Sequence, residues 1–194
     1  MKLGDLANIR SGLVLSRKLA KEPTAYKYNA LNFRSIRKDN TIDISELDAY
    51  DATERLKEDY LSQKDDIIVR LTAPYNAILI DDSTSNIVIS SNFLLIRVNK
   101  ERLSPEYLFW YLNTEKSKRA IYKEMTTNML AAVNARYFTE LNLEPISLEN
   151  QNKIGKLNLL AMNEVNKLHE LADEKQKYYS HVIGDIYSKM KRSN

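Results

Sequence analysis

Glu144-Pro145-Ile146-Ser147-Leu148-Glu149-Asn150-Gln151-Asn152-Lys153-Ile154 divides the chain into two parts with different patterns. The residues before this stretch form short strand-like runs and turns, and those after it form one helical pattern that extends almost to Asn194. Pro145 ends a strand, because proline donates no ladder hydrogen bond and biases the preceding residue away from the helical region. Ser147 can cap the helix that follows, and Glu149 in its first turn is favoured by the helix dipole. The stretch therefore predicts a globular part that continues directly into a long helix.

A hydrophobic stripe follows one face of this helix. Apolar side chains recur at steps of three and four, or sums of these, from Ile154 to Met190, while Lys, Glu and Asn fill the other face. About 40 residues at 1.5 Å each make a rod of roughly 60 Å, which a globular part roughly 30 Å across cannot cover. We therefore expect a coiled coil with a partner helix. The residues predicted to form the dimer interface are Ile154, Leu157, Ala161, Leu168, Tyr179, Ile183 and Ile186.

Two glycines, Gly155 and Gly184, fall inside the helical pattern. Each costs about 1 kcal/mol inside a helix relative to alanine. Close approach of another helix would explain both positions, and so would fraying near the helix ends.

The composition limits the class of protein. A chain of 194 residues suits one domain of ordinary size, with or without an appendage, and 43% hydrophobic residues support a core. The absence of cysteine excludes disulfides, thiolate catalysis and cysteine metal sites. No apolar run is long enough to cross a membrane, and the first residues do not form a signal peptide. We expect a soluble, cytoplasmic protein.

The net charge of +3 hides an uneven distribution. Residues 1–38 hold nine Lys or Arg against two acids, whereas residues 39–66 hold ten acids against three Lys or Arg. A basic stripe is the electrostatic feature expected of a nucleic-acid binder, although ordinary solvated surface would give the same counts.

The part before the junction predicts a mixture of strands and helices. Ser104-Pro105-Glu106 is a helix start, with a capping Ser, Pro at the first helical position and then an acid. A second helix is expected from Thr114 to about Met125. The expected strands are Leu6–Arg10, Lys27–Phe33, Asp65–Leu71, Ala77–Ile80, Asn86–Val98 (with a bend at Ser90–Asn92) and Leu141–Leu143. The predicted fold class is mixed α+β with mainly antiparallel strands over residues 1–146, followed by one long coiled-coil helix over residues 147–192.

No catalytic or cofactor-binding group is recognisable. Four glycines are too few for a phosphate-binding loop, and both histidines lie in the expected rod, which predicts no metal site and no cofactor. Thr72-Ala73-Pro74-Tyr75 is faintly similar to the Asp/Asn-Pro-Pro-Tyr motif of amino-methyltransferases, but the leading amide or acid and the first proline are missing.

Five segments in order resemble one half of the DNA-specificity (S) subunit of type I restriction–modification systems. They are Leu3–Gly12, Leu61–Ile68, Val88–Arg97, Ser104–Leu112 and Leu143–Ile154, the last being similar to the family junction Pro-Leu-Pro-Pro-Leu-x-x-Gln-x-x-Ile. Two positions depart from the family pattern: Asp65 stands where the family usually has Gly, and Ser147 replaces a proline. A family S subunit carries two target recognition domains and two helices, whereas this chain has one of each. It is therefore either a natural half-subunit or a truncation.

The resemblance implies a non-catalytic, sequence-specific DNA-binding subunit. Residues 1–146 would be the target recognition domain, and residues 147–192 the helix for dimerisation and spacing. Its implied partners are double-stranded DNA, a methyltransferase subunit and a restriction or translocase subunit. A coiled-coil adaptor whose globular domain binds protein, and a stand-alone enzyme, are the alternatives.

The DNA face is predicted from the basic N-terminal block and from a loop before the junction. Ser11, Arg17 and Lys18 follow the first expected strand, and Arg and Asn are the residues that pair bidentately with base edges. The expected DNA-binding residues are Ser11, Arg17, Lys18, Thr126, Thr127, Asn128, Asn134 and Arg136. The alternative is that Thr126–Arg136 is only a surface connection.

A half-subunit can restore the two-domain arrangement only by pairing with itself. The family's two helices run antiparallel, which implies an antiparallel homodimer here. Two identical readers related by a two-fold axis would read identical half-sites, so the expected target is an interrupted palindrome.

Overall fold

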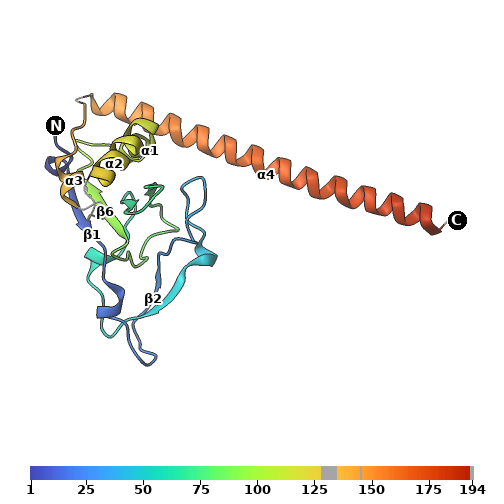
Figure 1. The fold of residues 1–194 in the computed structure, drawn as a ribbon, viewed down its shortest axis with the longest axis horizontal. Coiled ribbons are helices and arrows are strands. Elements are labelled where there is room, and N and C mark those ends of the chain that lie inside the picture. Colours follow the sequence, from blue (N-terminus) through green and yellow to red (C-terminus); the bar gives the residue numbers. More distant parts are fainter. Residues whose placement is uncertain (128–134, 145, 193–194) are drawn as a thin grey trace. The chain divides into compact units, whose positions relative to one another are not determined.

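The computed structural model describes residues 1–127, 135–144 and 146–192. The chain consists of two compact units, Met1–Lys156 and Leu157–Asn194. The described residues of the first unit form antiparallel sheets and three α-helices, and a long helix begins within this unit (Figure 1). The prediction of an α+β globular part followed by one long C-terminal helix is confirmed. Among the described residues no helix is long and apolar enough to cross a membrane.

A four-stranded antiparallel sheet forms the centre of the first unit. Its strands are β1 (Ala7–Ser11), β6 (Phe93–Val98), β4 (Ile67–Arg70) and β5 (Ala77–Leu79), in the order β1-β6-β4-β5. A separate two-stranded sheet pairs β2 (Lys27–Ala30) with β3 (Asp48–Asp51). The described residues also form four short 3-10 helices: η1 (Leu3–Asp5), η2 (Leu15–Arg17), η3 (Ile44–Glu46) and η4 (Glu58–Tyr60).

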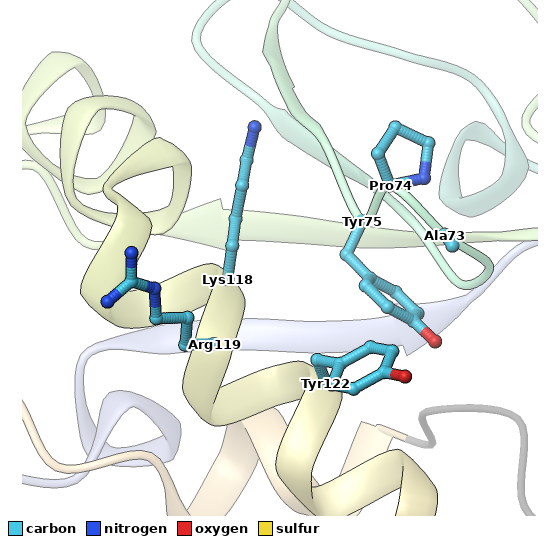
Figure 2. Close-up of a pocket in the computed structure, with 6 residues that line it drawn as sticks. All are labelled: Ala73, Pro74, Tyr75, Lys118, Arg119 and Tyr122. Carbon is cyan, nitrogen blue, oxygen red and sulfur yellow. The ribbon is translucent and has the colours of Figure 1, made fainter.

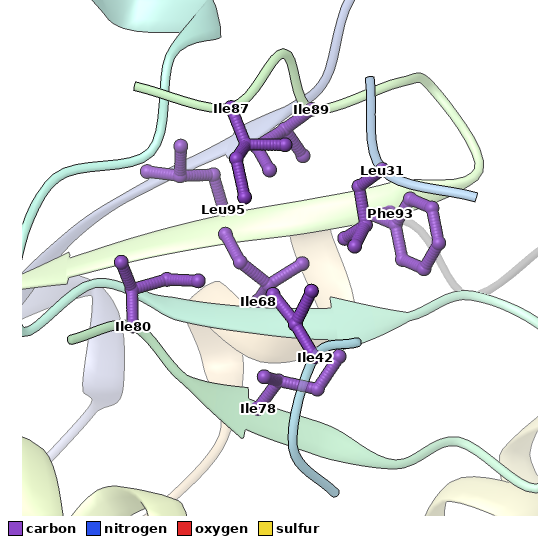
Figure 3. Packing of buried hydrophobic residues seen from close by; sticks show 9 residues of the cluster. All are labelled: Leu31, Ile42, Ile68, Ile78, Ile80, Ile87, Ile89, Phe93 and Leu95. Atoms are coloured by element: carbon purple, nitrogen blue, oxygen red, sulfur yellow. The ribbon is translucent and has the colours of Figure 1, made fainter. Parts of the chain in front are cut away.

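Both faces of the central strands are covered, which explains their continuous apolar sequences. Ile67, Ile68 and Val69 of β4 are all buried, although successive side chains of a strand point to opposite faces. One face carries a cluster drawn from the sheet and from irregular segments that cross it (Figure 3). The cluster consists of Leu31, Ile42, Ile68, Ile78, Ile80, Ile87, Ile89, Phe93 and Leu95. The helix α1 (Pro105–Asn113) contacts β4 and β5.

The helices of the first unit begin close to their predicted positions. Ser104 Oγ accepts from the Tyr107 amide at 3.4 Å, which confirms the predicted cap of α1. The second helix, α2, spans Glu115–Thr127, close to its predicted range. In Figure 1, α1, α2 and α3 (Ala135–Glu140) lie together beside β1 and β6, and β2 lies at the end of the unit away from them.

The long helix α4 spans Leu148–Arg192. The Asn150 amide donates to Ser147 Oγ at 3.3 Å, so Ser147 is the predicted cap, and Glu149 lies in the first turn. Just before the junction, the amide of Leu143 donates to the Met1 carbonyl at 2.8 Å and the Leu3 amide donates to the Leu141 carbonyl at 2.8 Å. The first residues of the chain are thereby fixed beside the segment that leads into α4.

Several predicted elements differ in the structure. The strand expected over Asn86–Val98 is wrong in its first half, because the backbone of Ile87–Ile89 bonds to several different segments rather than to one neighbouring strand. Leu141–Leu143 contributes only an isolated bridge, between Lys2 and Asn142, rather than a strand. The strand β3 was not predicted, because its sequence Asp-Ala-Tyr-Asp has a single buried residue, Tyr50.

Candidate nucleic-acid interface

The basic N-terminal block and the acidic block that follows it fold against each other. Four of the nine basic residues in 1–38 pair with acids in 39–66: Arg10–Asp59, Lys18–Glu54, Arg34–Asp48 (2.9 Å) and Arg37–Asp43 (2.8 Å). The hydrogen bond from Lys18 lowers the pKa of the Glu54 carboxyl. The sequence does not show this pairing, because the partners lie in different segments of the chain. The pairing reduces the positive potential that the N-terminal block presents to a polyanion.

Ser11, Arg17 and Lys18 occupy different environments. Ser11 is the exposed last residue of β1, opposite Leu94 of β6. Arg17 is exposed at the end of η2, whereas Lys18 is half-buried and paired with Glu54. The turn after Ser11 needs glycine, because a Cβ on Gly12 would lie 2.2 Å from the Ser90 carbonyl oxygen.

The predicted loop before the junction is wrong as a loop at its described positions. Thr126 and Thr127 are the last residues of α2, and Arg136 is an exposed residue of α3. Asn128 and Asn134 lie outside the described residues. The helix α3 escaped prediction because it is short and carries one fully buried side chain, Phe138.

The predicted residues lie on separate elements where the structure describes them: Ser11 in β1, Arg17 in η2, Thr126 and Thr127 in α2, and Arg136 in α3. The helix α3, which carries Arg136, packs against η1 and β1. Arg17 lies in η2, which follows β1, whereas η1 precedes it. The role of these residues in DNA binding therefore stays a prediction for each one separately.

The structure also brings together basic and aromatic residues that the sequence analysis did not group. Tyr75, in the loop between β4 and β5, and Lys118, Arg119 and Tyr122 of α2 line one hollow with Ala73 and Pro74 (Figure 2). The sequence held two separate signals, the Thr72–Tyr75 segment and the basic residues of the second helix. Only the fold places them side by side.

Gln151 fixes the start of α4 to the start of α1. Its side chain is 3% exposed; its Oε1 accepts from the Ser104 amide at 2.9 Å, and its Nε2 donates to the Ile146 carbonyl at 3.0 Å. Gly155 lies one turn further along, where a Cβ would come 2.6 Å from Cβ of Glu106. The predicted close helix approach is thus confirmed at Gly155.

Beyond this junction, the predicted interface residues of α4 are open to solvent in the single chain. Leu157, Leu168 and Ile183 are 68%, 57% and 65% exposed. Ala161, Tyr179 and Ile186 are also exposed, whereas Ile154 is half-buried within the first unit.

No family model and no curated protein matches the chain, but three solved structures share its fold. The HsdS subunit from Thermoanaerobacter tengcongensis has a TM-score of 0.53 and 13% identity, over 85% of this chain and 38% of that one. A chain from a structure on complex assembly and conformational transition of the type I R-M system has a TM-score of 0.64 and 18% identity, over 91% and 45%. The type I restriction-modification S subunit from M. genitalium has a TM-score of 0.52 and 15% identity, over 86% and 39%.

The chain therefore has the fold of type I restriction–modification S subunits, which confirms the resemblance at the level of fold. It spans less than half the length of each matched structure.

Proposed function

We propose that this chain is a DNA specificity subunit of a type I restriction–modification system. In this role it reads DNA sequence and positions separate methyltransferase and restriction subunits, without catalysing either reaction itself. Residues 1–146 act as the target recognition domain, and residues 147–192 serve for dimerisation and spacing.

One observation carries the proposal: a single globular unit is fixed to the start of a single long helix within an S-subunit fold. The hydrogen bonds of Gln151 and the close packing at Gly155 hold the first turns of α4 against the start of α1 within the globular unit. A specificity subunit has to hold its reading domain in a defined relation to its assembly helix, so this junction suits the role.

The exposed stripe of α4 supports self-association. Large apolar side chains that remain exposed along a helix favour burial against a second helix. We propose an antiparallel homodimer, in which each copy reads one half of an interrupted palindrome.

A salt titration of DNA binding tests the proposal. The full-length chain is mixed with a labelled mixed-sequence duplex, and the affinity is measured by fluorescence anisotropy at several salt concentrations. We expect log affinity to fall linearly with log salt, because phosphate contacts release counterions. A protein-binding adaptor would show no duplex binding at low salt, and that result would reject the proposed function.

A second assay tests the non-catalytic role. The purified chain is incubated with duplex DNA and labelled S-adenosylmethionine, alone and together with the methyltransferase subunit of the same cells. We expect methyl transfer only in the mixture. Methyl transfer by the chain alone would contradict the proposal.

A further inference from the structure

A hollow of about 250 Å³ lies between the β4–β5 loop and α2. Figure 2 shows the rings of Tyr75 and Tyr122 next to each other, while Lys118 and Arg119 extend from α2, the Arg119 guanidinium pointing away from the rings at the edge of the hollow. The hollow thus combines two aromatic rings with two cationic side chains.

Hydrogen bonds hold the loop against the helices. Lys118 Nζ donates to Asn76 Oδ1 at 3.0 Å. Asn113, the last residue of α1, binds both backbone groups of Ala77: its Oδ1 accepts from the amide at 3.2 Å and its Nδ2 donates to the carbonyl at 2.9 Å. The two sides of the hollow are therefore in place before any ligand arrives, which reduces the ordering cost of binding.

Tyr75 has an unusual backbone conformation for its residue type. Its φ is 57°, in the left-handed region that bulky residues rarely adopt. Its amide donates to the Thr72 carbonyl at 3.0 Å, which closes the turn. Such outliers persist only where the surrounding structure enforces them, and they cluster at ligand-binding positions.

The cations of the hollow are only weakly compensated by nearby acids. The Arg119 side chain is 82% exposed, and its Nε lies 3.8 Å from an exposed Glu115 carboxylate oxygen. Such a surface pair is weak and screened by salt. Lys118 uses one of the three donors of its ammonium group for Asn76. Both groups can therefore bind an added anion.

We propose that this hollow is a contact for the sugar–phosphate backbone of the DNA duplex. Arg119 and Lys118 hold a phosphate, while the rings of Tyr75 and Tyr122 pack against the adjoining sugar and their hydroxyls donate to phosphate oxygens. The inference rests on the proposed function and deepens it. It assigns to the hollow the positioning of the protein on DNA of any sequence, rather than the reading of bases.

The shape of the hollow favours a backbone over an extruded base. An extruded base needs a snug pocket that encloses it, whereas this hollow is open to solvent and Tyr122 is 60% exposed. Two cationic side chains that extend from one helix at an open surface suit an anion that passes across it.

Duplex binding of two variants and a matched control tests the site. Arg119→Glu reverses a charge in the hollow, and Tyr122→Ala removes a ring. Lys153→Glu is the control, because Lys153 is also exposed (68%) and also pairs with a glutamate four residues away, Glu149, but lies on α4. Binding is measured by fluorescence anisotropy with a mixed-sequence duplex at several salt concentrations. The recognised sequence need not be known, because phosphate contacts are independent of sequence.

We expect Arg119→Glu to weaken binding about tenfold and to reduce the salt slope by about 1. Tyr122→Ala should weaken binding about threefold and leave the slope unchanged, and Lys153→Glu should stay within about twofold of wild type. Arg119→Gln, which removes the charge without reversing it, should reduce the slope to the same extent.

Two outcomes would overturn the inference, and they are distinguishable. If wild type binds DNA with the expected salt slope but the Arg119 variants match Lys153→Glu, the hollow is not a DNA contact and the proposed function stands. An acidic protein partner of the hollow would give that result. If wild type binds no duplex at low salt, the proposed function and this inference are both rejected. Circular dichroism melting confirms that each variant is folded.

Discussion

The buried carboxylate of Asp66 forms an ion pair with the partly buried guanidinium of Arg97. Its carboxylate is 1% exposed and accepts Arg97 Nε and Nη2 at 2.7 Å each, and it also accepts from the Gln63 amide at 2.8 Å. The preceding Asp65 has a φ of 71°, which explains why the S-subunit pattern usually has glycine there. Aspartate tolerates this region better than most residues. The two neighbouring carboxylates therefore have structural roles, Asp65 through its ion pair with Lys100 and Asp66 through its pair with Arg97.

Asp66→Ala is expected to lower the free energy of unfolding by about 3 kcal/mol, because it leaves a partly buried guanidinium and a backbone amide without their acceptor. Asp82→Ala is the control, since Asp82 is 80% exposed and pairs with the exposed Lys64. We expect that control to change stability by no more than about 0.5 kcal/mol. Urea denaturation followed by circular dichroism measures both, and equal losses would contradict the structural role of Asp66.

At the scale of elements, α4 contains two glycines in opposite surroundings. A Cβ on Gly155 would lie 2.8 Å from both Glu106 C and Tyr107 N, which are backbone atoms of α1. A Cβ on Gly184 would have no described atom within 4 Å apart from its chain neighbours and its own helix backbone. Close helix packing thus explains Gly155, and the single chain gives no structural reason for Gly184.

Gly155→Ala is expected to destabilise the globular unit by about 2 kcal/mol, because backbone atoms cannot move aside as a flexible side chain can. Gly184→Ala should instead stabilise α4 by up to about 1 kcal/mol, since alanine is the better helix former. Thermal and urea unfolding of the two variants, compared with wild type, shows whether each substitution raises or lowers the free energy of unfolding. A destabilising Gly184→Ala would indicate that a partner helix approaches closely there.

At the scale of the whole molecule, the exposed stripe of α4 predicts a dimer. Replacing Leu157, Leu168 and Ile183 with glutamate should convert the dimer to a monomer and leave the globular unit folded, because these side chains are exposed in the single chain. The control reverses the charges of Glu170 and Lys177, which lie on the polar face. Light scattering at micromolar concentration reports the mass, and a monomeric wild type would contradict the prediction.

The symmetry of a homodimer makes a prediction about DNA. Two identical recognition domains related by a two-fold axis should read an interrupted palindrome, with half-site centres on the order of 34 Å apart if both copies read one face of the duplex. Methylome sequencing of cells that contain this chain and its methyltransferase gives the motif directly. A motif with two unlike halves would rule out the symmetric dimer.

The sequence by itself determined the elements that depend on local chemistry. Each of these signals is local in sequence. They are the three- and four-residue spacing of the stripe from Ile154 to Met190, the cap at Ser147 and the helix start at Ser104-Pro105. Periodicity and capping act over three to seven residues, so α1 and α4 could be predicted from the sequence. The irregular Ile87–Ile89 segment could not, because its hydrogen-bond partners lie tens of residues away.

Only the tertiary structure decided which side chains meet. It paired four residues of the basic N-terminal block with the acidic block, as at Arg34–Asp48, and so reduced the positive potential of that block. It also placed Tyr75 beside Arg119 and Tyr122, from separate segments of the chain, in a hollow that no local pattern predicts. These contacts depend on closing long loops around a shared core, and the free energy that selects them comes from burying the whole sheet.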